Sequence, residues 1–125
     1  MTNQLRLYNT LTRRVQPFQS LAPGRVKMFV CGPTIQDYIH LGHARTYLFY
    51  DMLSRYLSYL GYSVSFVVNI TDVDEGIVKG ARARGLPLDE FTSKYERGFV
   101  EDMGKLGIKS VSHFDRVTSH IPEMI

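Results

Sequence analysis

The chain has 125 residues, 44% of them hydrophobic and 22% charged, a composition typical of one globular domain that can bury its own core. Fifteen basic and twelve acidic side chains give a net charge of +3, which is compatible with an anionic partner but lacks a dense Lys/Arg run. No apolar run approaches the roughly 18 residues of a membrane helix, and the N-terminus lacks the apolar segment of a signal peptide. The single cysteine cannot form an internal disulfide, so we expect a reducing, cytoplasmic setting without a membrane.

The first 25 residues are predicted to form an N-terminal arm or hairpin. They are polar with short apolar pieces, and they end in the turn signal Ala22-Pro23-Gly24. Residues 26–32 then form a short run rich in β-forming side chains, which is typical of a strand buried on both faces.

Residues 42–60 change to a helical period. Apolar side chains recur at three- and four-residue spacing and predict the buried face: Ala44, Tyr47, Leu48, Met52, Leu53, Tyr56, Leu57 and Leu60. The polar side chains between them predict the solvent-facing side: Arg45, Asp51, Ser54, Arg55 and Ser58. Gly61 would end this helix, and residues 62–70 predict a second buried strand.

Two further helices are predicted after the second strand. Asp72 and Glu75 have capping-box spacing, so a helix should begin there and stop near Gly85. Pro87 is well placed to start another helix, which Gly107 would end. Its predicted apolar line is Phe91, Tyr95, Phe99 and Met103.

The order strand, helix, strand, helix predicts an α/β fold with a parallel sheet, a right-handed crossover and flanking helices. Ligands bind such sheets beyond the carboxyl ends of the strands. Cys31 ends the first predicted strand, and Asn69 to Thr71 end the second. We therefore expect both strand ends and the nearby histidines to share one edge of the sheet.

The histidine pair His40-Leu41-Gly42-His43 falls at the predicted first turn of the long helix. A helix N-terminus presents unpaired N–H groups and a positive dipole, which suit a phosphate. Two imidazoles beside it could donate hydrogen bonds to oxygens that gain charge at a phosphorus centre. Gly42 would leave room for a nucleotide base or ribose. The alternative is that both are surface or capping histidines.

Cys31 also allows several interpretations. A lone cysteine at a strand end is usually a small buried hydrophobic residue. Beside a helix N-terminus it could instead be a reactive thiolate or a metal ligand. A structural zinc site needs about four protein ligands, and the sequence has no C-x-x-C pair to supply them.

Several motifs in order resemble those of class I cysteinyl-tRNA synthetases: "YNTLTR", "CGPT", "HLGHARTY", "RYLSYLGY" and "NITDVD". The resemblance covers nearly the whole chain and matches the N-terminal part of the catalytic domain, with the Rossmann-like (HUP-type) sheet truncated. It implies a hairpin or arm at residues 1–25 and the first half of the catalytic domain at residues 26–112. Residues 113–125 would be the start of the connective insertion.

The resemblance also implies roles for individual residues. His40, Leu41, Gly42 and His43 match the HIGH signature that binds ATP, with Thr34 also at the ATP site, and the two histidines stabilise the transition state of adenylate formation. Cys31 matches the first ligand of a Zn²⁺ ion that binds the substrate thiolate. The cysteinyl-adenylate pocket would be lined by Cys31, Gly32, Thr34, Thr46, Asn69 and Thr71.

The implied reaction joins L-cysteine and ATP, with Mg²⁺, to give cysteinyl-adenylate, and then transfers the cysteine to tRNA(Cys). The enzyme is expected to be cytoplasmic and monomeric. Zinc binds a thiolate far better than a hydroxyl, so coordination would separate cysteine from serine, which a size-based pocket separates poorly. The other zinc ligands, the KMSKS-type loop and the anticodon-binding region do not occur in these residues. We therefore expect the 125-residue chain by itself to be inactive.

One departure and three alternatives accompany the resemblance. Asp74 is followed by Glu75 and Gly76, where the family usually has an acidic residue and a lysine. The nearest alternative is the cysteine ligase of mycothiol synthesis. A second is another H-x-G-H nucleotidyl transferase, which would not need Cys31, and a third is a non-catalytic module with the same fold.

Overall fold

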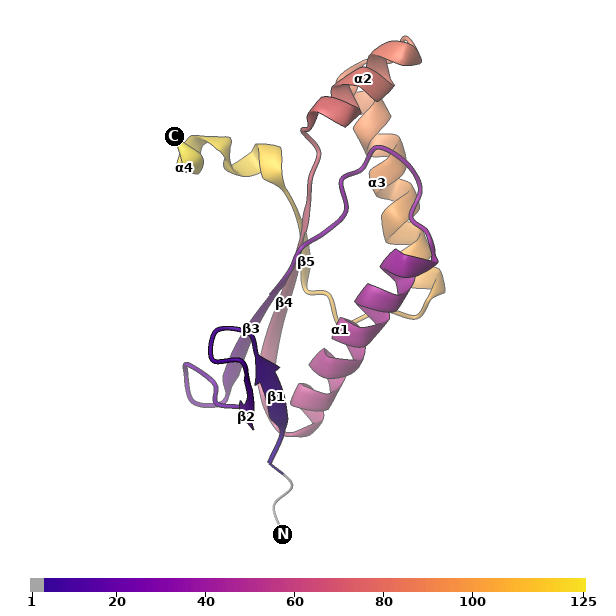
Figure 1. The fold of residues 1–125 in the computed structure, drawn as a ribbon. Coiled ribbons are helices and arrows are strands. Elements are labelled where there is room, and N and C mark those ends of the chain that lie inside the picture. Colours follow the sequence, from indigo (N-terminus) through magenta and orange to yellow (C-terminus); the bar gives the residue numbers. More distant parts are fainter. Residues whose placement is uncertain (1–3) are drawn as a thin grey trace.

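The computed structural model describes residues 4–125, which form a hairpin followed by alternating strands and helices (Figure 1). The elements in chain order are β1 (Arg6–Asn9), β2 (Arg14–Pro17), β3 (Arg25–Val30), α1 (Leu41–Tyr59), β4 (Ser63–Ile70), α2 (Glu75–Ala83), α3 (Leu88–Lys105), β5 (His113–Arg116), the 3₁₀ helix η1 (Val117–His120) and α4 (Ile121–Met124).

The main sheet has the strand order β3-β4-β5, and both pairs are parallel. This arrangement confirms the predicted α/β fold with a parallel sheet. The sequence predicted only two of its strands and missed β5, which pairs residues 113–116 with the end of β4. The assignment of residues 113–125 to a connective insertion stays a prediction.

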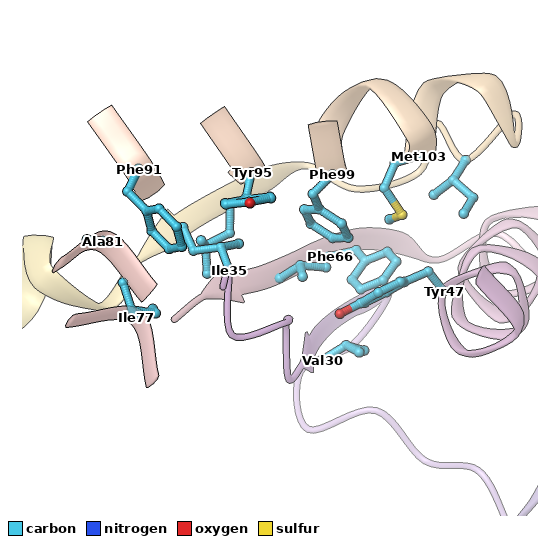
Figure 2. Close-up of a cluster of buried hydrophobic side chains, with 13 residues drawn as sticks. Val30, Ile35, Tyr47, Phe66, Ile77, Ala81, Phe91, Tyr95, Phe99 and Met103 are labelled. Atoms are coloured by element: carbon cyan, nitrogen blue, oxygen red, sulfur yellow. The ribbon is translucent and has the colours of Figure 1, made fainter. Parts of the chain in front are cut away.

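Helices α1 and α3 lie on the same side of the sheet, and the core fills the space between them and β4 (Figure 1). The predicted apolar line of α3 is confirmed, because its four side chains are each no more than 4% exposed. Figure 2 shows them pointing toward Phe66 and Ile35. Among the helices between residues 4 and 125, none is both long and apolar enough to cross a membrane.

The predicted buried face of α1 is partly wrong. Ala44, Tyr47 and Leu57 are buried as expected, but so are Asp51 and Ser54. The physical reason is a tertiary contact: the Asp51 carboxylate accepts hydrogen bonds from the loop between α3 and β5, which turns this side of the helix inward. The displaced apolar side chains are exposed instead: Leu48, Met52, Tyr56 and Leu60.

The predicted cap of α2 is wrong as well. The N-cap is Asp74, whose Oδ1 accepts the N–H of Gly76 at 2.8 Å, so α2 begins at Glu75. Asp72 is buried and accepts the N–H of Thr118 at 3.0 Å and the Thr118 hydroxyl. Asp72 and Asp74 could both cap α2. Asp72 instead binds Thr118, so Asp74 is the N-cap.

The N-terminal hairpin packs against the start of β4. Strands β1 and β2 are antiparallel, with Tyr8 opposite Val15 and Asn9 opposite Arg14. The Phe18 ring meets the Tyr62 ring edge to face at a centroid distance of 5.8 Å. The hairpin therefore lies beside the start of β3, at the opposite end of the sheet from the carboxyl ends of the strands (Figure 1).

Candidate functional site

The ends of β3 and β4 meet at Gly32. Its N–H donates to the Asn69 side-chain oxygen at 2.8 Å. A Cβ atom at residue 32 would lie 1.5 Å from the Asn69 carbonyl oxygen, so only glycine allows the two backbones to come this close.

The pairing continues beyond this close approach. The Ile35 N–H donates to the Thr71 carbonyl, and the Thr71 N–H donates to the Pro33 carbonyl, both at 3.1 Å. Thr34 and Thr71 thereby form an isolated parallel bridge. The predicted site residues of the two strand ends are thus brought together, as the topology of a parallel sheet predicts.

The second part of the site is the N-terminus of α1, which His40 caps. Its Nδ1 accepts the Gly42 N–H at 3.0 Å, and the His43 Nδ1 accepts the His40 N–H at 3.3 Å. The two rings lie 4.2 Å apart between centroids. The interpretation of these residues as capping histidines is therefore correct, and the helix-terminal position expected for phosphate binding is correct too.

The capping bonds also fix where the two imidazoles carry their protons. A neutral imidazole that accepts at Nδ1 must carry its proton on Nε2. Both rings are therefore held as Nε2–H donors, while the backbone of the first turn occupies their Nδ1 atoms. Such an arrangement can offer two hydrogen bonds to anionic oxygens without losing the cap.

Gly42 has a different neighbour from the one expected. A Cβ atom at this position would lie 2.8 Å from Cε1 of His40. The space that the sequence suggested for a nucleotide base or ribose is occupied by the imidazole of His40. Gly42 thus lets the capping ring lie against the backbone.

His43 is expected to titrate below its ordinary pKa of 6.5, because burial lowers this pKa and the neighbouring His40 lowers it further. Above pH 6.5 the imidazole is neutral in both the folded and the unfolded chain. As the pH falls below 6.5, the unfolded chain binds the proton first, and the free energy of unfolding decreases. NMR titration of the imidazole should give a midpoint below 6.5, and a midpoint above it would contradict the described surroundings. Urea denaturation should show a smaller loss between pH 7 and pH 5 in His43→Asn than in the wild type.

Tyr47 connects the two parts of the site. It lies one turn after His43 on α1, is 2% exposed, and donates its hydroxyl to the Cys31 carbonyl at 3.3 Å. Burial, and secondarily the nearby Cys31, raise the pKa of Tyr47 far above its ordinary value, so the phenol stays protonated as a donor. The sequence predicted Tyr47 only as a core position. Its hydroxyl could have indicated a further role, because a tyrosine hydroxyl in a buried apolar line needs a hydrogen-bond partner.

The Cys31 thiol is exposed, and its Sγ makes only a long contact of 3.7 Å with the Gly32 carbonyl. A free thiol at a strand end is a suitable soft ligand for zinc. Within residues 4–125, however, no group of three or more His, Cys, Asp or Glu side chains is placed to hold a metal ion. The described residues therefore supply one candidate zinc ligand but no complete zinc site.

The remaining predicted site residues lie along α1. The Thr46 hydroxyl donates to the Gly42 carbonyl at 3.1 Å, and Leu41 is 85% exposed at the first turn. Gly42 and Thr46 help to line a depression of about 420 Å³ beside Arg45. No described contact joins the Cys31 sulfur directly to either histidine, so the link between the two parts of the site runs through Tyr47.

Two solved structures show that this arrangement is a class I synthetase fold. The LeuRS encoded by agnB2 of Agrobacterium radiobacter K84, solved with tRNA and LeuAMS, has a TM-score of 0.65 and 26% sequence identity, covering 78% of this chain and 13% of its own. The methionyl-tRNA synthetase of Mycobacterium tuberculosis, solved with methionyl-adenylate, has a TM-score of 0.68 and 23% identity, covering 74% and 18%.

The sequence comparisons narrow this class to one family. Residues 17–125 match the family model of the tRNA synthetases class I (C) catalytic domain, and the chain belongs to this family. Cysteine--tRNA ligases of Thermoplasma acidophilum and Pyrococcus furiosus are both 47% identical over 121 residues, which is 97% of this chain. The alignments cover 27% and 25% of those relatives, so the chain spans about a quarter of their length.

Proposed function

We propose that a full-length protein carrying this chain activates L-cysteine with ATP and transfers it to tRNA(Cys), and that these residues form part of its active site. The observation that carries the proposal is the Tyr47–Cys31 hydrogen bond, which holds the strand end with the thiol beside the helix with the two histidines. The similarity to cysteine--tRNA ligases along nearly the whole chain supports the choice of amino acid.

In the proposed reaction, the cysteine carboxylate attacks the α-phosphate of ATP and pyrophosphate leaves. The Nε2–H groups of His40 and His43 would donate to phosphate oxygens as negative charge develops there, and the N-terminus of α1 would add its dipole. Thr34 and Leu41 would lie along the nucleotide. The pocket for cysteinyl-adenylate would be lined by Gly32, Thr46, Asn69 and Thr71.

Cys31 would be one ligand of a zinc ion whose other ligands lie outside residues 1–125. Such an ion would bind the thiolate of the substrate and thereby discriminate against serine. The exposed Cys31 Sγ is compatible with this role. Because the described residues complete no metal site, the 125-residue chain by itself is expected to show no cysteine-dependent ATP–pyrophosphate exchange.

The test of the proposal is His43→Asn in a full-length protein. We expect the rate of cysteine-dependent ATP–pyrophosphate exchange to fall about 10²- to 10³-fold, because one preorganised donor to the transition state is lost. His120→Asn, which replaces an exposed histidine elsewhere, is the matched control and should keep the wild-type rate. Equal rates for both variants, with both proteins folded, would rule out the proposed role.

Cys31→Ser separates the proposal from the alternatives. A cysteine activator should show a strongly raised KM for cysteine, whereas an H-x-G-H nucleotidyl transferase should be unaffected. The cysteine ligase of mycothiol synthesis would share the cysteine effect but transfer the product to an amino sugar instead of tRNA. A protein that activates no amino acid would instead be the non-catalytic module.

A further inference from the structure

Asn69 lies where the carboxyl ends of β3 and β4 meet, and both ends of its side-chain amide have partners. Its Oδ1 accepts the Gly32 N–H at 2.8 Å, and its Nδ2 lies 3.4 Å from the Thr71 Oγ1. Asn69 and Thr71 are two residues apart, so their side chains leave the strand on the same face. Ile70 between them is fully buried in the core. The amide therefore bridges the two strand ends on the face opposite Ile70.

The bond to Gly32 determines which way this amide faces. A backbone N–H can only donate, so the atom beside Gly32 must be the amide oxygen. The NH₂ group then faces Thr71, and because an NH₂ group can only donate, the Thr71 oxygen must accept. The distance of 3.4 Å is long for such a bond, but the direction of donation does not depend on it.

The backbone of Thr71 is held on both sides as well. Its N–H donates to the Pro33 carbonyl, and its carbonyl accepts the Ile35 N–H, both at 3.1 Å. Within residues 4–125, the one side-chain hydrogen bond of Thr71 uses its oxygen as acceptor and leaves the hydroxyl proton unused. Thr71 is half-buried rather than sealed in the core, so this proton can reach a ligand at the strand ends.

We infer that Asn69 is a positioning residue that presets the Thr71 hydroxyl as a hydrogen-bond donor toward the substrate. Because the Thr71 oxygen already accepts from Asn69, the hydroxyl proton is directed away from the amide, toward an acceptor oxygen of bound cysteine or of its adenylate. A hydroxyl without such a partner rotates freely and has to be ordered when the ligand binds. The inference rests on the proposed function, because it assigns how one residue of that pocket is oriented by another.

Asn69→Asp reverses the direction of this bond with little change of shape. The carboxylate still accepts the Gly32 N–H, but it cannot donate, so it accepts the proton of the Thr71 hydroxyl instead. In a full-length protein we expect the KM for cysteine in ATP–pyrophosphate exchange to rise at least about tenfold and kcat to change less than about threefold, because a contact common to the ground and transition states is lost. Thr71→Ser keeps the hydroxyl and should keep KM within about threefold of the wild type.

A double-mutant comparison separates the effect of the hydroxyl from that of the added charge. In a Thr71→Val background, Asn69→Asp should raise KM by no more than about threefold, because no hydroxyl is left to reorient. The matched control is Asn9→Asp in the β1–β2 hairpin, whose side-chain oxygen likewise accepts a backbone N–H, that of Leu11 at 2.9 Å. It lies at the other end of the sheet and should leave KM within about twofold of the wild type (Figure 1). Equal rises in KM in the two backgrounds would overturn the inference.

A second measurement does not depend on activity. In ¹H–¹⁵N spectra of the purified protein, the side-chain NH₂ signals of Asn69 should move in Thr71→Val and keep their positions in Thr71→Ser, because only valine removes the acceptor. Unchanged Asn69 signals in Thr71→Val would overturn the role of Asn69 even in a protein that activates cysteine. A wild-type protein without cysteine-dependent exchange would instead refute the proposed function, and the Asn69 signals would still decide whether the hydroxyl is preset.

Discussion

Gly32→Ala is expected to lower the free energy of unfolding by about 3–5 kcal/mol, a large part of the stability of a domain of this size. The added Cβ would lie 1.5 Å from the Asn69 carbonyl oxygen, and both atoms belong to backbones that cannot move without separating the strand ends. The Gly32 N–H would also lose its bond to the Asn69 side chain, at a further cost of about 1 kcal/mol. Urea denaturation at neutral pH measures the change.

Gly104→Ala provides the matched control for this substitution. Gly104 lies in α3, and a Cβ atom there would have no neighbour within 4 Å. Alanine is the better helix former, so the same added methyl group should raise stability by about 0.5–1 kcal/mol. If both variants unfolded at the same urea concentration as the wild type, the close approach of the strand ends at Gly32 would be refuted.

Asp51→Ala is expected to lower the free energy of unfolding by about 2–4 kcal/mol. Its carboxylate accepts the Lys109 N–H at 3.1 Å and the Ser110 N–H and hydroxyl at 3.0 and 2.6 Å. Arg55 adds an ion pair at 2.6 Å, but this guanidinium is 55% exposed and contributes less. Removal of the carboxylate would leave the donors of the α3–β5 loop without their acceptor.

The control for Asp51 is Asp102→Ala. Asp102 forms a surface ion pair with Lys105 at 3.2 Å, and its loss should change stability by less than about 0.5 kcal/mol. A loss at Asp51 no larger than that at Asp102 would show that the carboxylate does not anchor the loop.

The effect of Asp51 should depend on pH in one direction. Burial by itself raises the pKa of Asp51, but the hydrogen bonds from Ser110, Lys109 and Arg55 outweigh it and hold the pKa below the ordinary 3.8. The stabilisation is therefore fully present above pH 3.8 and is lost as the pH falls through the lowered value. The difference between the wild type and Asp51→Asn should be the same at pH 7 and pH 5 and smaller at pH 3.

The helix α3 and the helix α1 show where sequence prediction succeeded and where it failed. The apolar positions of α3 form one narrow line, so only one orientation of this helix buries all of them. The apolar positions of α1 cover more than half of its circumference, and several orientations would bury a similar number of them. The loop that binds Asp51 selects one orientation, and that contact joins residues 58 or 59 positions apart in the sequence.

The candidate site was predictable to the extent that topology determines it. Parallel strands end at one edge, so the meeting of Gly32 with Asn69 and of Thr34 with Thr71 followed from the strand order. The strand β5 was missed because it has only four residues, three of them with polar side chains, and so carries too little periodicity. The hydroxyl of Tyr47 could not be assigned a partner, because its acceptor is a backbone carbonyl sixteen residues away.

The histidine cap has a consequence for how the first turn of α1 responds to a ligand. A ligand that accepts hydrogen bonds from the Nε2–H groups leaves the capping bonds of the first turn intact. A ligand that binds Nδ1 must break these capping bonds and unwind the turn. The solvent exchange rate of the Gly42 amide proton thus reports, at a single atom, which side of the His40 ring is engaged.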